Sequence, residues 1–287
     1  MPKTFHWDED FKKVSDVLIV DNIDSFGKIR QLMKLHRFAC IIPITLEQTK
    51  WTDQHKRFVP LVCAPTLAVY QMFNNKKLFA QFMKRSKFNQ YIPTVYSETD
   101  INQKIDCVEF PVILKRRVGY GSIGSIVIEN KNQLMCELTK RQQNEFIIQK
   151  YISDPEEYTA HLLLVNGSIR HDICYLSRNE TKNYIQAGRT YNYIRLKSMP
   201  DLCEFAFEEI FKKVNYTGFA CVDFKMIQTD GTDETDGTNG TNGTNETVKT
   251  VQIFEINPRI GGSLVANTSD FKEMLTKTTN IFSGCSN

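Results

Sequence analysis

The stretch FPVILKRRVGYGSIGSIVIEN, residues 110–130, contains the pattern Gly-x-Gly-x-x-Gly in GYGSIG. Dinucleotide-binding folds, protein kinases and another ATP-binding fold all use glycines spaced in this way. A dinucleotide-binding fold needs a helix directly after the glycines, because the helix N-terminus meets the pyrophosphate. Here SIVIEN follows, and its β-branched residues favour a strand. The glycines are therefore predicted to join two antiparallel strands.

Two other phosphate-binding patterns fail on the same stretch. A Walker loop would end in Gly-Lys-Ser/Thr, whereas Ser125 follows Gly124. A protein kinase needs His-Arg-Asp and Asp-Phe-Gly, and the chain offers only RHD and DFK. What remains is Lys115 at the end of a strand, followed by Gly119 and Gly121, whose backbone N–H groups can approach a phosphate unobstructed. A glycine hairpin beside a surface lysine is the alternative.

Length, charge and cysteine usage limit the function classes. A chain of 287 residues has room for two domains or one large composite domain. Its net charge of +3 is small for this length, so no nucleic acid partner is expected. No apolar run approaches the roughly 18 residues of a membrane span, and the N-terminus lacks the form of a signal peptide. The eight cysteines form no Cys-x-x-Cys pair, which favours free thiols. We expect a cytoplasmic protein without a membrane partner.

Helices and strands alternate along the chain. Residues 66–85 have helical apolar spacing that Asn74 and Asn75 interrupt, so two helices with a corner are predicted. Strands are expected over 145–152 and in a hairpin that turns at Asn166-Gly167. A helix with Asp201 at its N-cap is expected over 201–214. Two further strands cover 218–228 and 248–256.

An unusual segment separates those last two strands. Residues 229–247 repeat the triplet (Asp/Asn)-(Gly/Glu)-Thr, which contains nothing apolar. Such a composition cannot build a core, so the segment is predicted to be a disordered insert in a hairpin. Its acids recur every three residues and not at the alternating positions of a calcium loop, which disfavours a calcium site.

A second group of polar residues lies on the strands that flank this insert. In GFACVDFKMIQ, Asp223 shares a face with Cys221 and Lys225. In QIFEINPR, Glu255 and Asn257 are two residues apart and also share a face. Carboxylates in apolar strands are costly unless they are paired or bind a metal. Two carboxylates and an amide oxygen suit Mg²⁺ when triphosphate oxygens complete its shell. Solvent-facing acids on edge strands are the alternative.

Together these motifs resemble the ATP-grasp superfamily, in its branch of carboxylate–amine ligases related to carbamoyl-phosphate synthetase and biotin carboxylase. The resemblance covers residues 65–268 and keeps the family's order of motifs. It implies an α+β fold in which two lobes clasp ATP, with a small parallel α/β domain before them. The implied parts are a reduced N-terminal domain (1–70), a small lobe with the glycine loop (71–150) and a large lobe with the metal site (151–287).

The resemblance also implies a role for individual residues. Lys76 looks like the first lysine that contacts phosphate, with Lys77 as the alternative, and Lys115 matches the second. Arg259 matches the arginine that steadies the acceptor's carboxylate or its acyl phosphate, and it joins Lys115 as a catalytic residue. The residues implied to bind ATP are Lys76, Lys115, Gly119, Gly121, Ser122, Gly124, Gln149, Lys150, Tyr151, Ile152 and Glu157. Those implied to bind the metal are Asp223, Glu255 and Asn257.

The implied reaction uses ATP and Mg²⁺, for which Mn²⁺ can substitute, to activate a small carboxylate as an acyl phosphate that an amine or a similar nucleophile attacks. Arg178, Lys182 and Arg189 lie where relatives often bind the acceptor, and a homodimer is a further expectation. Two other activities stay open on the sequence alone. One is a kinase of the same fold that phosphorylates a small molecule, and the other is a nucleotide-binding module without catalysis.

Overall fold

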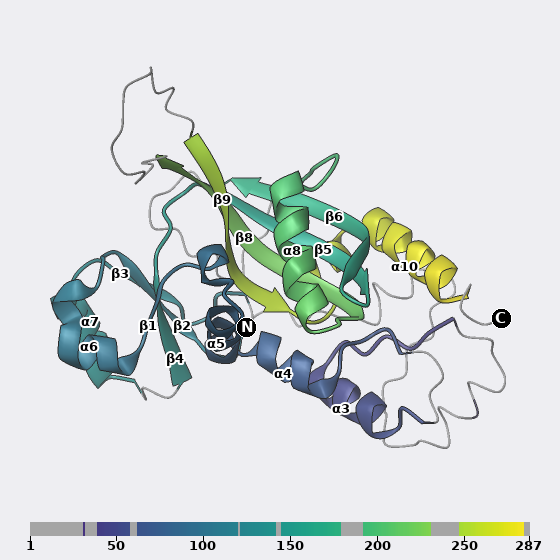
Figure 1. Cartoon of the computed structure of the whole chain (residues 1–287), viewed down its shortest axis with the longest axis horizontal. Coiled ribbons are helices and arrows are strands. Elements are labelled where there is room, and N and C mark those ends of the chain that lie inside the picture. Colours follow the sequence, from purple (N-terminus) through teal and green to yellow (C-terminus); the bar gives the residue numbers. More distant parts are fainter. Residues whose placement is uncertain are drawn as a thin grey trace, which may run out of the picture.

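Two antiparallel sheets organise the chain in the computed structural model, which describes residues 31, 39–57, 62–119, 121–141, 145–178, 192–230 and 247–283. In Figure 1 the four-stranded sheet lies at the left, and the five-stranded sheet fills the centre. The strand orders are β1-β4-β2-β3 in the first and β7-β6-β5-β8-β9 in the second. The expectation of two α+β lobes is confirmed.

The smaller sheet carries the glycine loop. Its strands β2 and β3 pair antiparallel, with Val112 opposite Ile128, so the predicted hairpin is confirmed. One face packs Leu114 against Ile101 and Leu134, which come from the two helices beside the sheet. The opposite face is turned toward the other lobe. The elements are β1 (Val95–Tyr96), α6 (Glu98–Lys104), η2 (Ile105–Cys107), β2 (Val112–Arg116), β3 (Ile126–Ile128), α7 (Lys131–Thr139) and β4 (Phe146–Lys150).

The larger sheet is built from two long hairpins. The first turns at Asn166-Gly167 as predicted, and Gly167 has a φ of +81°. A Cβ there would clash with the backbone of Lys212, so this turn accepts only glycine. The second hairpin pairs Asp230 with Thr247 at its far end. The strands are β5 (Glu156–Val165), β6 (Ser168–Arg178), β7 (Ile194–Arg195), β8 (Gly218–Asp230) and β9 (Thr247–Asn257).

Helices cover both faces of the larger sheet. On one face α8 (Asp201–Lys213) packs over the sheet. On the other face α9 (Gly262–Ala266) and α10 (Thr268–Ser283) cover part of the sheet, and the pocket shared with the smaller sheet opens on the same face. The predicted N-cap of α8 is wrong by one residue. Pro200 takes the cap position and Asp201 is the first helical residue, where its charge favours the helix dipole instead.

The predicted corner between two helices is present. The two helices pack on the larger lobe, and not on the smaller lobe to which the prediction gave residues 71–150. Asn75 separates α4 from α5, and its side chain accepts hydrogen bonds from the backbone N–H groups of Lys77 and Leu78 in the first turn of α5. Phe73 and Phe79, one from each helix, join the core between the larger sheet and α8. These helices therefore pack on the larger lobe, although residues 71–150 were assigned to the smaller one. The N-terminal helical elements are α3 (Leu46–Gln54), α4 (Leu67–Asn74), α5 (Lys76–Arg85) and η1 (Asn89–Tyr91).

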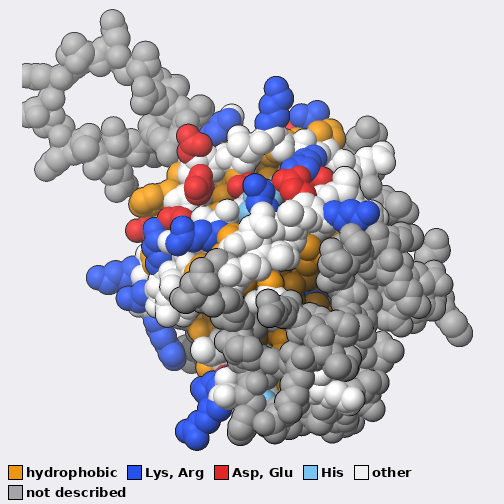
Figure 2. All heavy atoms as spheres, turned by 90° about the vertical axis from the view of Figure 1, so that its right-hand side faces the viewer, with side chains coloured by type: hydrophobic (Ala, Val, Ile, Leu, Met, Phe, Trp, Pro, Cys, Tyr) orange, Lys and Arg blue, Asp and Glu red, His pale blue; other side chains and the backbone are white. Residues whose placement is uncertain are grey.

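Some predictions fall outside the described residues. Residues 1–30 and 32–38 of the predicted N-terminal domain lie there, as do residues 231–246 of the predicted insert. The described part of residues 1–70 includes one parallel bridge, Ile41 to Val62. Within the described part, every helix is too short or too polar to cross a membrane. Figure 2 shows acidic and basic side chains interspersed across the upper part of one face.

Candidate functional site

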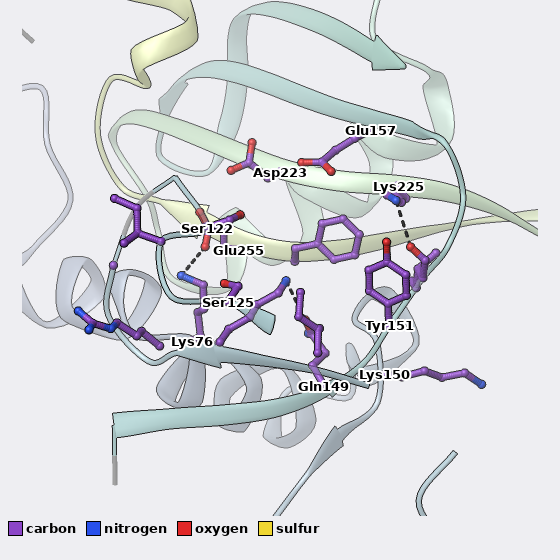
Figure 3. Close-up of a pocket in the computed structure, with 17 residues that line it drawn as sticks. Lys76, Ser122, Ser125, Gln149, Lys150, Tyr151, Glu157, Asp223, Lys225 and Glu255 are labelled. Atoms are coloured by element: carbon purple, nitrogen blue, oxygen red, sulfur yellow. Dashed lines mark hydrogen bonds and ion pairs between the residues drawn. The ribbon is translucent and has the colours of Figure 1, made fainter. Parts of the chain in front are cut away.

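A pocket lies between the two sheets, and most residues predicted for the site line it (Figure 3). The larger sheet supplies acidic residues on one side, and the smaller sheet and α5 supply lysines on the other. The predicted residues that line the pocket are Lys76, Lys115, Gly119, Ser122, Gln149, Lys150, Tyr151, Ile152, Glu157, Asp223 and Glu255.

Cross-strand pairing brings the two predicted metal-binding carboxylates together. Asp223 on β8 lies directly opposite Glu255 on β9 and, on its other side, opposite Thr159 of β5. The Thr159 hydroxyl donates a hydrogen bond of 2.9 Å to Oδ1 of Asp223. Directly opposite residues on one face have Cβ atoms about 5 Å apart. The register therefore sets two carboxylates side by side, which the sequence predicted only as two separate pairs of same-face residues.

A β-bulge shapes this part of the site. The register shifts after Asp223, so that Glu255 faces Asp223 while the next residue of β8 faces Ile253. Phe254 is the extra residue, and it lines the pocket next to Glu255. Ile253 and Ile256 both join the core on the opposite face, which strict alternation would not allow. The bulge thus turns an aromatic ring and a carboxylate to the same side.

Glu255 is held as an anion by its neighbours. The Lys76 ammonium forms an ion pair with it, and the two side chains are only 10% and 18% exposed. Asn257 donates a hydrogen bond of 3.0 Å to Oε1 of Glu255. Burial alone would raise the pKa of Glu255, but Lys76 and then Asn257 lower that pKa to about 2. Lys76, and not Lys77, is the lysine of this helix that lines the pocket.

Asp223 has the opposite electrostatic behaviour. Part of its surface opens to the pocket, but protein surrounds its carboxyl group. Burial, followed by the charges of Glu255 and Glu157, raises the pKa of Asp223 to about 8. Lys76 compensates the charge of Glu255 but not that of Asp223, so the pKa values of the two neighbouring carboxyl groups move apart. A divalent cation would supply that charge.

The smaller sheet contributes Lys115 and Gln149 from adjacent strands. Both residues line the pocket, and Nζ of Lys115 donates a 3.3 Å hydrogen bond to Oε1 of Gln149. Nζ of Lys115 also lies 4.8 Å from the centre of the Phe254 ring. Burial lowers the pKa of Lys115 to about 8, against the opposing effect of Glu255. This lysine therefore lacks a full counter-charge in its surroundings, which suits a group that binds phosphate.

The described part of the glycine loop lines the pocket with Gly119, Ser122, Ile123 and Ser125. Gly121 and Gly124 do not line it. Gly121 and Gly124 have φ values of +59° and +77°, so they shape the loop's backbone. Tyr120 lies outside the described residues.

The connection from β4 to β5 lines the pocket with Tyr151 and Ile152. Lys150 turns its side chain away from the pocket and pairs it with Glu109. The backbone N–H groups of Lys150 and Tyr151 donate to Thr94 O (2.8 Å) and Pro111 O (3.0 Å) in the smaller lobe. On the other side, burial raises the pKa of Glu157 despite nearby lysines.

Arg259 lies outside the pocket lining, beside α4. Its Nη1 is 3.4 Å from Oδ1 of Asn74, and its charge acts on the hydroxyl of the buried Tyr70. Arg178 pairs with Glu156, whereas the other two predicted acceptor residues, at 182 and 189, are outside the described residues.

Three residues that matter to the site were not predicted from the sequence patterns: Thr159, Lys225 and Phe254. Lys225 is 6% exposed and lines the pocket. Its shared face with Asp223 was a usable signal, because a lysine in an apolar strand needs partners. Phe254 carried no signal, since only the bulge directs it inward.

The donor set fits a magnesium ion bound together with a nucleotide. Among the described residues, no group of three His, Cys, Asp or Glu side chains is arranged to hold a metal by itself. Asp223 and Glu255 therefore need oxygen ligands from elsewhere. Mg²⁺ is commonly bound by one or two carboxylates plus substrate phosphates. Lys76 and Lys115 flank the same space and match that phosphate.

Comparison with known proteins agrees with this geometry. A family model described as an ATP-grasp domain matches residues 73–263, more than half of the chain. Among curated proteins, no sequence matches significantly. An L-amino acid ligase from Bacillus licheniformis has a similar structure, with a TM-score of 0.52 and 13% identity over 84% of this chain and 54% of its own.

Two further structures are similar. The D-alanine–D-alanine ligase from Bacillus anthracis has a TM-score of 0.55 and 15% identity, over 83% of this chain and 75% of its own. The biotin carboxylase domain of a Hydrogenobacter thermophilus 2-oxoglutarate carboxylase, crystallised with MgADP, ADP and bicarbonate, gives a TM-score of 0.55 and 15% identity over 93% and 59%. The chain thus spans little more than half the length of the L-amino acid ligase and the carboxylase domain.

Proposed function

The chain belongs to the ATP-grasp family, and from that premise we propose that it is an ATP- and Mg²⁺-dependent ligase. It activates a small carboxylate by phosphorylation and then transfers the acyl group to an amine or a similar nucleophile. The observation that carries this proposal is the pair Asp223 and Glu255, in register on adjacent strands and facing Lys76 and Lys115 across one pocket. The family resemblance alone supports a small carboxylate acceptor and a homodimer.

In this proposal each side of the pocket handles one part of the nucleotide. Lys115 and Lys76 bind phosphate oxygens, and the backbone of Gly119 approaches them closely. Gln149 and the backbone of residues 150–152 read the base. The Oε1 atom of Gln149 already accepts from Lys115, and an amide oxygen has a second lone pair for an exocyclic amine.

Asp223, Glu255 and Asn257 hold the magnesium ion, with Asn257 acting at least through its hydrogen bond to Glu255. When bound, the ion neutralises charge on the phosphate oxygens as the phosphoryl group transfers. In the absence of nucleotide, Lys76 neutralises Glu255. Lys76 would thus neutralise Glu255 in the nucleotide-free site and bind phosphate in the loaded one.

The proposed reaction proceeds in two steps, phosphoryl transfer and then acyl transfer. The acceptor's carboxylate oxygen attacks the γ-phosphorus, the bond to the β-phosphate oxygen breaks, and ADP leaves. The amine then attacks the acyl carbon, phosphate leaves, and the amine's proton passes to phosphate or solvent. The first step needs no general base, because a carboxylate is already a nucleophile. Arg259, whose Nη1 donates a hydrogen bond to the side chain of Asn74, positions the acceptor's carboxylate.

A screen of amino acids and small carboxylates for acceptor-dependent ADP release tests this function. Arg259→Ala should retain ATP affinity within about twofold and lose acceptor-dependent turnover by a factor of 100 or more, because the carboxylate is no longer positioned. Arg170→Ala on β6 is the control and should behave as wild type. A stable phosphorylated product without a ligated one would overturn the ligase proposal in favour of a kinase. Loss of ATP binding in Arg259→Ala would contradict the role given to that arginine.

A further inference from the structure

Lys225 is a buried cation of the pocket to which the proposed chemistry gives no task. It lies on β8, two residues after Asp223, and is 6% exposed. Burying an ammonium group costs much free energy unless hydrogen bonds compensate it. Lys76 and Lys115 have a phosphate to bind in the proposed function, so the question is what Lys225 binds.

Its partners are backbone carbonyls of the connection between the two lobes. Nζ of Lys225 donates to the carbonyl oxygen of Ile152 at 3.0 Å and, at closer range, to that of Asp154. Figure 3 shows Lys225 beside Tyr151, at the end of the pocket away from Lys76. Hydrogen bonds from a charged donor are roughly twice as strong as those between neutral groups. Lys225 therefore fixes two neighbouring points of one irregular segment.

The same segment is also tied to the smaller lobe. Lys150 and Tyr151 donate their backbone N–H groups to Thr94 and Pro111 there. Residues 151–154 have no helix or strand of their own, so these bonds and those of Lys225 hold them between the sheets. From the larger lobe, the side chain of Lys225 binds this segment.

Two carboxylates lie near the ammonium group of Lys225: that of Glu157 on β5 and that of Asp154 on the connection. Its Nζ lies 6.0 Å from the centre of the Phe254 ring, which also faces Lys115. The ammonium group of Lys225 thus lies near this ring, Glu157 and two carbonyl oxygens, and Phe254, Glu157 and Ile152 also line the pocket.

We propose that Lys225 is a positioning residue for base recognition: it holds residues 151–154 in the conformation that reads the nucleotide base. This inference rests on the proposed function, since it takes these residues to contact the base. It predicts a division of binding energy in which Lys225 matters for the base and ribose end but not for the triphosphate.

The test compares ligands with and without a base. Lys225→Met keeps most of the side chain's volume and removes the donors. It should weaken MgATP binding by roughly 10-fold or more and move the ATP-to-GTP affinity ratio toward one. Magnesium tripolyphosphate, which has no base, should bind with the wild-type affinity. Lys213→Met, which removes an exposed lysine of α8, should match wild type for all three ligands.

Each other outcome is informative. Unchanged ATP affinity in a folded Lys225→Met variant would overturn the inference, and so would equal losses for ATP and tripolyphosphate, which would make Lys225 a phosphate ligand or a general stabiliser. If Lys225→Met does not fold, Lys225→Gln, which keeps an amide donor, should give an intermediate loss confined to ATP. Failure of wild type to bind either ligand would instead contradict the proposed function itself.

Discussion

The two sheets each turn one face to the same pocket, but they present different charges. The smaller sheet offers Lys115 and the amide of Gln149, whereas the larger one offers Glu157, Asp223 and Glu255. The larger sheet also supplies Lys225, which donates a hydrogen bond to the backbone of the connection between the lobes. In the proposed function, the smaller sheet thus contributes to phosphate binding and the larger sheet to metal binding, while Lys76 adds a phosphate ligand from α5 on the larger lobe. A ligand that carries both a metal and phosphates would contact both sheets.

The two sheets also differ in how far their buried charged groups are paired with opposite charges. Lys115 has a lowered pKa because it is buried without a full counter-charge. Glu255 has a counter-charge, but Lys76 comes from a helix and not from either sheet. Asp223 lacks such a partner, and burial raises its pKa. The acidic sheet is thus only partly compensated until a further cation binds.

Removing the carboxylates should have the largest effect. Asp223→Asn and Glu255→Gln should each lower acceptor-dependent turnover by about 100-fold or more, because magnesium loses a ligand where phosphoryl charge develops. Glu209→Gln, an exposed acid of α8, should leave turnover unchanged. Steady-state ADP release measures all three. Near-wild-type turnover in Glu255→Gln would contradict the metal assignment of β9.

Their stability effects should differ. Asp223→Asn should leave the free energy of unfolding of the nucleotide-free protein unchanged or raise it, since burial already favours the neutral acid. Glu255→Gln should lower it by about 3 kcal/mol, because Lys76 is left as an unpaired, mostly buried charge. Denaturant unfolding of the two variants tests this contrast, and equal effects would count against it.

Lys76 should compete with metal in the absence of nucleotide. Lys76→Met frees Glu255, so Mn²⁺ should bind the nucleotide-free variant about 10-fold more tightly than wild type, while MgATP binds more weakly. Electron paramagnetic resonance of free Mn²⁺ measures the first effect. Lys77→Met is the matched control from the same turn of α5 and should change neither affinity. Weaker Mn²⁺ binding in Lys76→Met would show that the ion pair does not shield the carboxylate.

The larger sheet should also give the protein a sensitivity to acid. His161 is 1% exposed and accepts or donates a 2.8 Å hydrogen bond at Ser263, and burial lowers its pKa to about 3. Below its unfolded value of about 6.5, the unfolded chain binds a proton that the folded chain does not. Stability should therefore fall as pH drops from 6.5 toward 3, by up to about 1.4 kcal/mol per unit.

His161→Gln tests this pH dependence, because glutamine stays neutral and can still bond to Ser263. The slope of unfolding free energy against pH between 6.5 and 4 should be smaller in the variant by up to one proton. An unchanged slope would assign the acid sensitivity to other groups.

The smallest effect is expected at the far end of the β8–β9 hairpin. Deleting residues 231–246 and closing Asp230 to Thr247 with a two-residue turn should leave ATP affinity unchanged and shift the melting temperature by only a few degrees. The deleted segment contains no apolar residue, and loop length changes closure entropy only slowly. A loss of more than about 10 °C would show that the segment stabilises the fold.

The sequence by itself determined the strand hairpin around the glycine loop, the corner at Asn75 and the shared face of Glu255 and Asn257. Each depends on local rules: β-branched residues after glycines, an interrupted helical period, and the two-residue period of a strand. Such rules act within a few residues, so they are visible in the chain. These local rules do not tell whether Lys76 or Lys77 faces the pocket, since both lie in the first turn of α5.

Only the tertiary structure decided which residues meet. The register of β8 and β9 set Asp223 against Glu255, and the bulge turned Phe254 into the pocket. The packing of α4 and α5 on the larger sheet brought Lys76 to Glu255 and Asn74 to Arg259. Strand register and helix packing depend on side chains that are far apart in sequence and are buried against one another in the folded core. The sequence therefore names the lysines and carboxylates, and the fold alone decides which of them compensate one another.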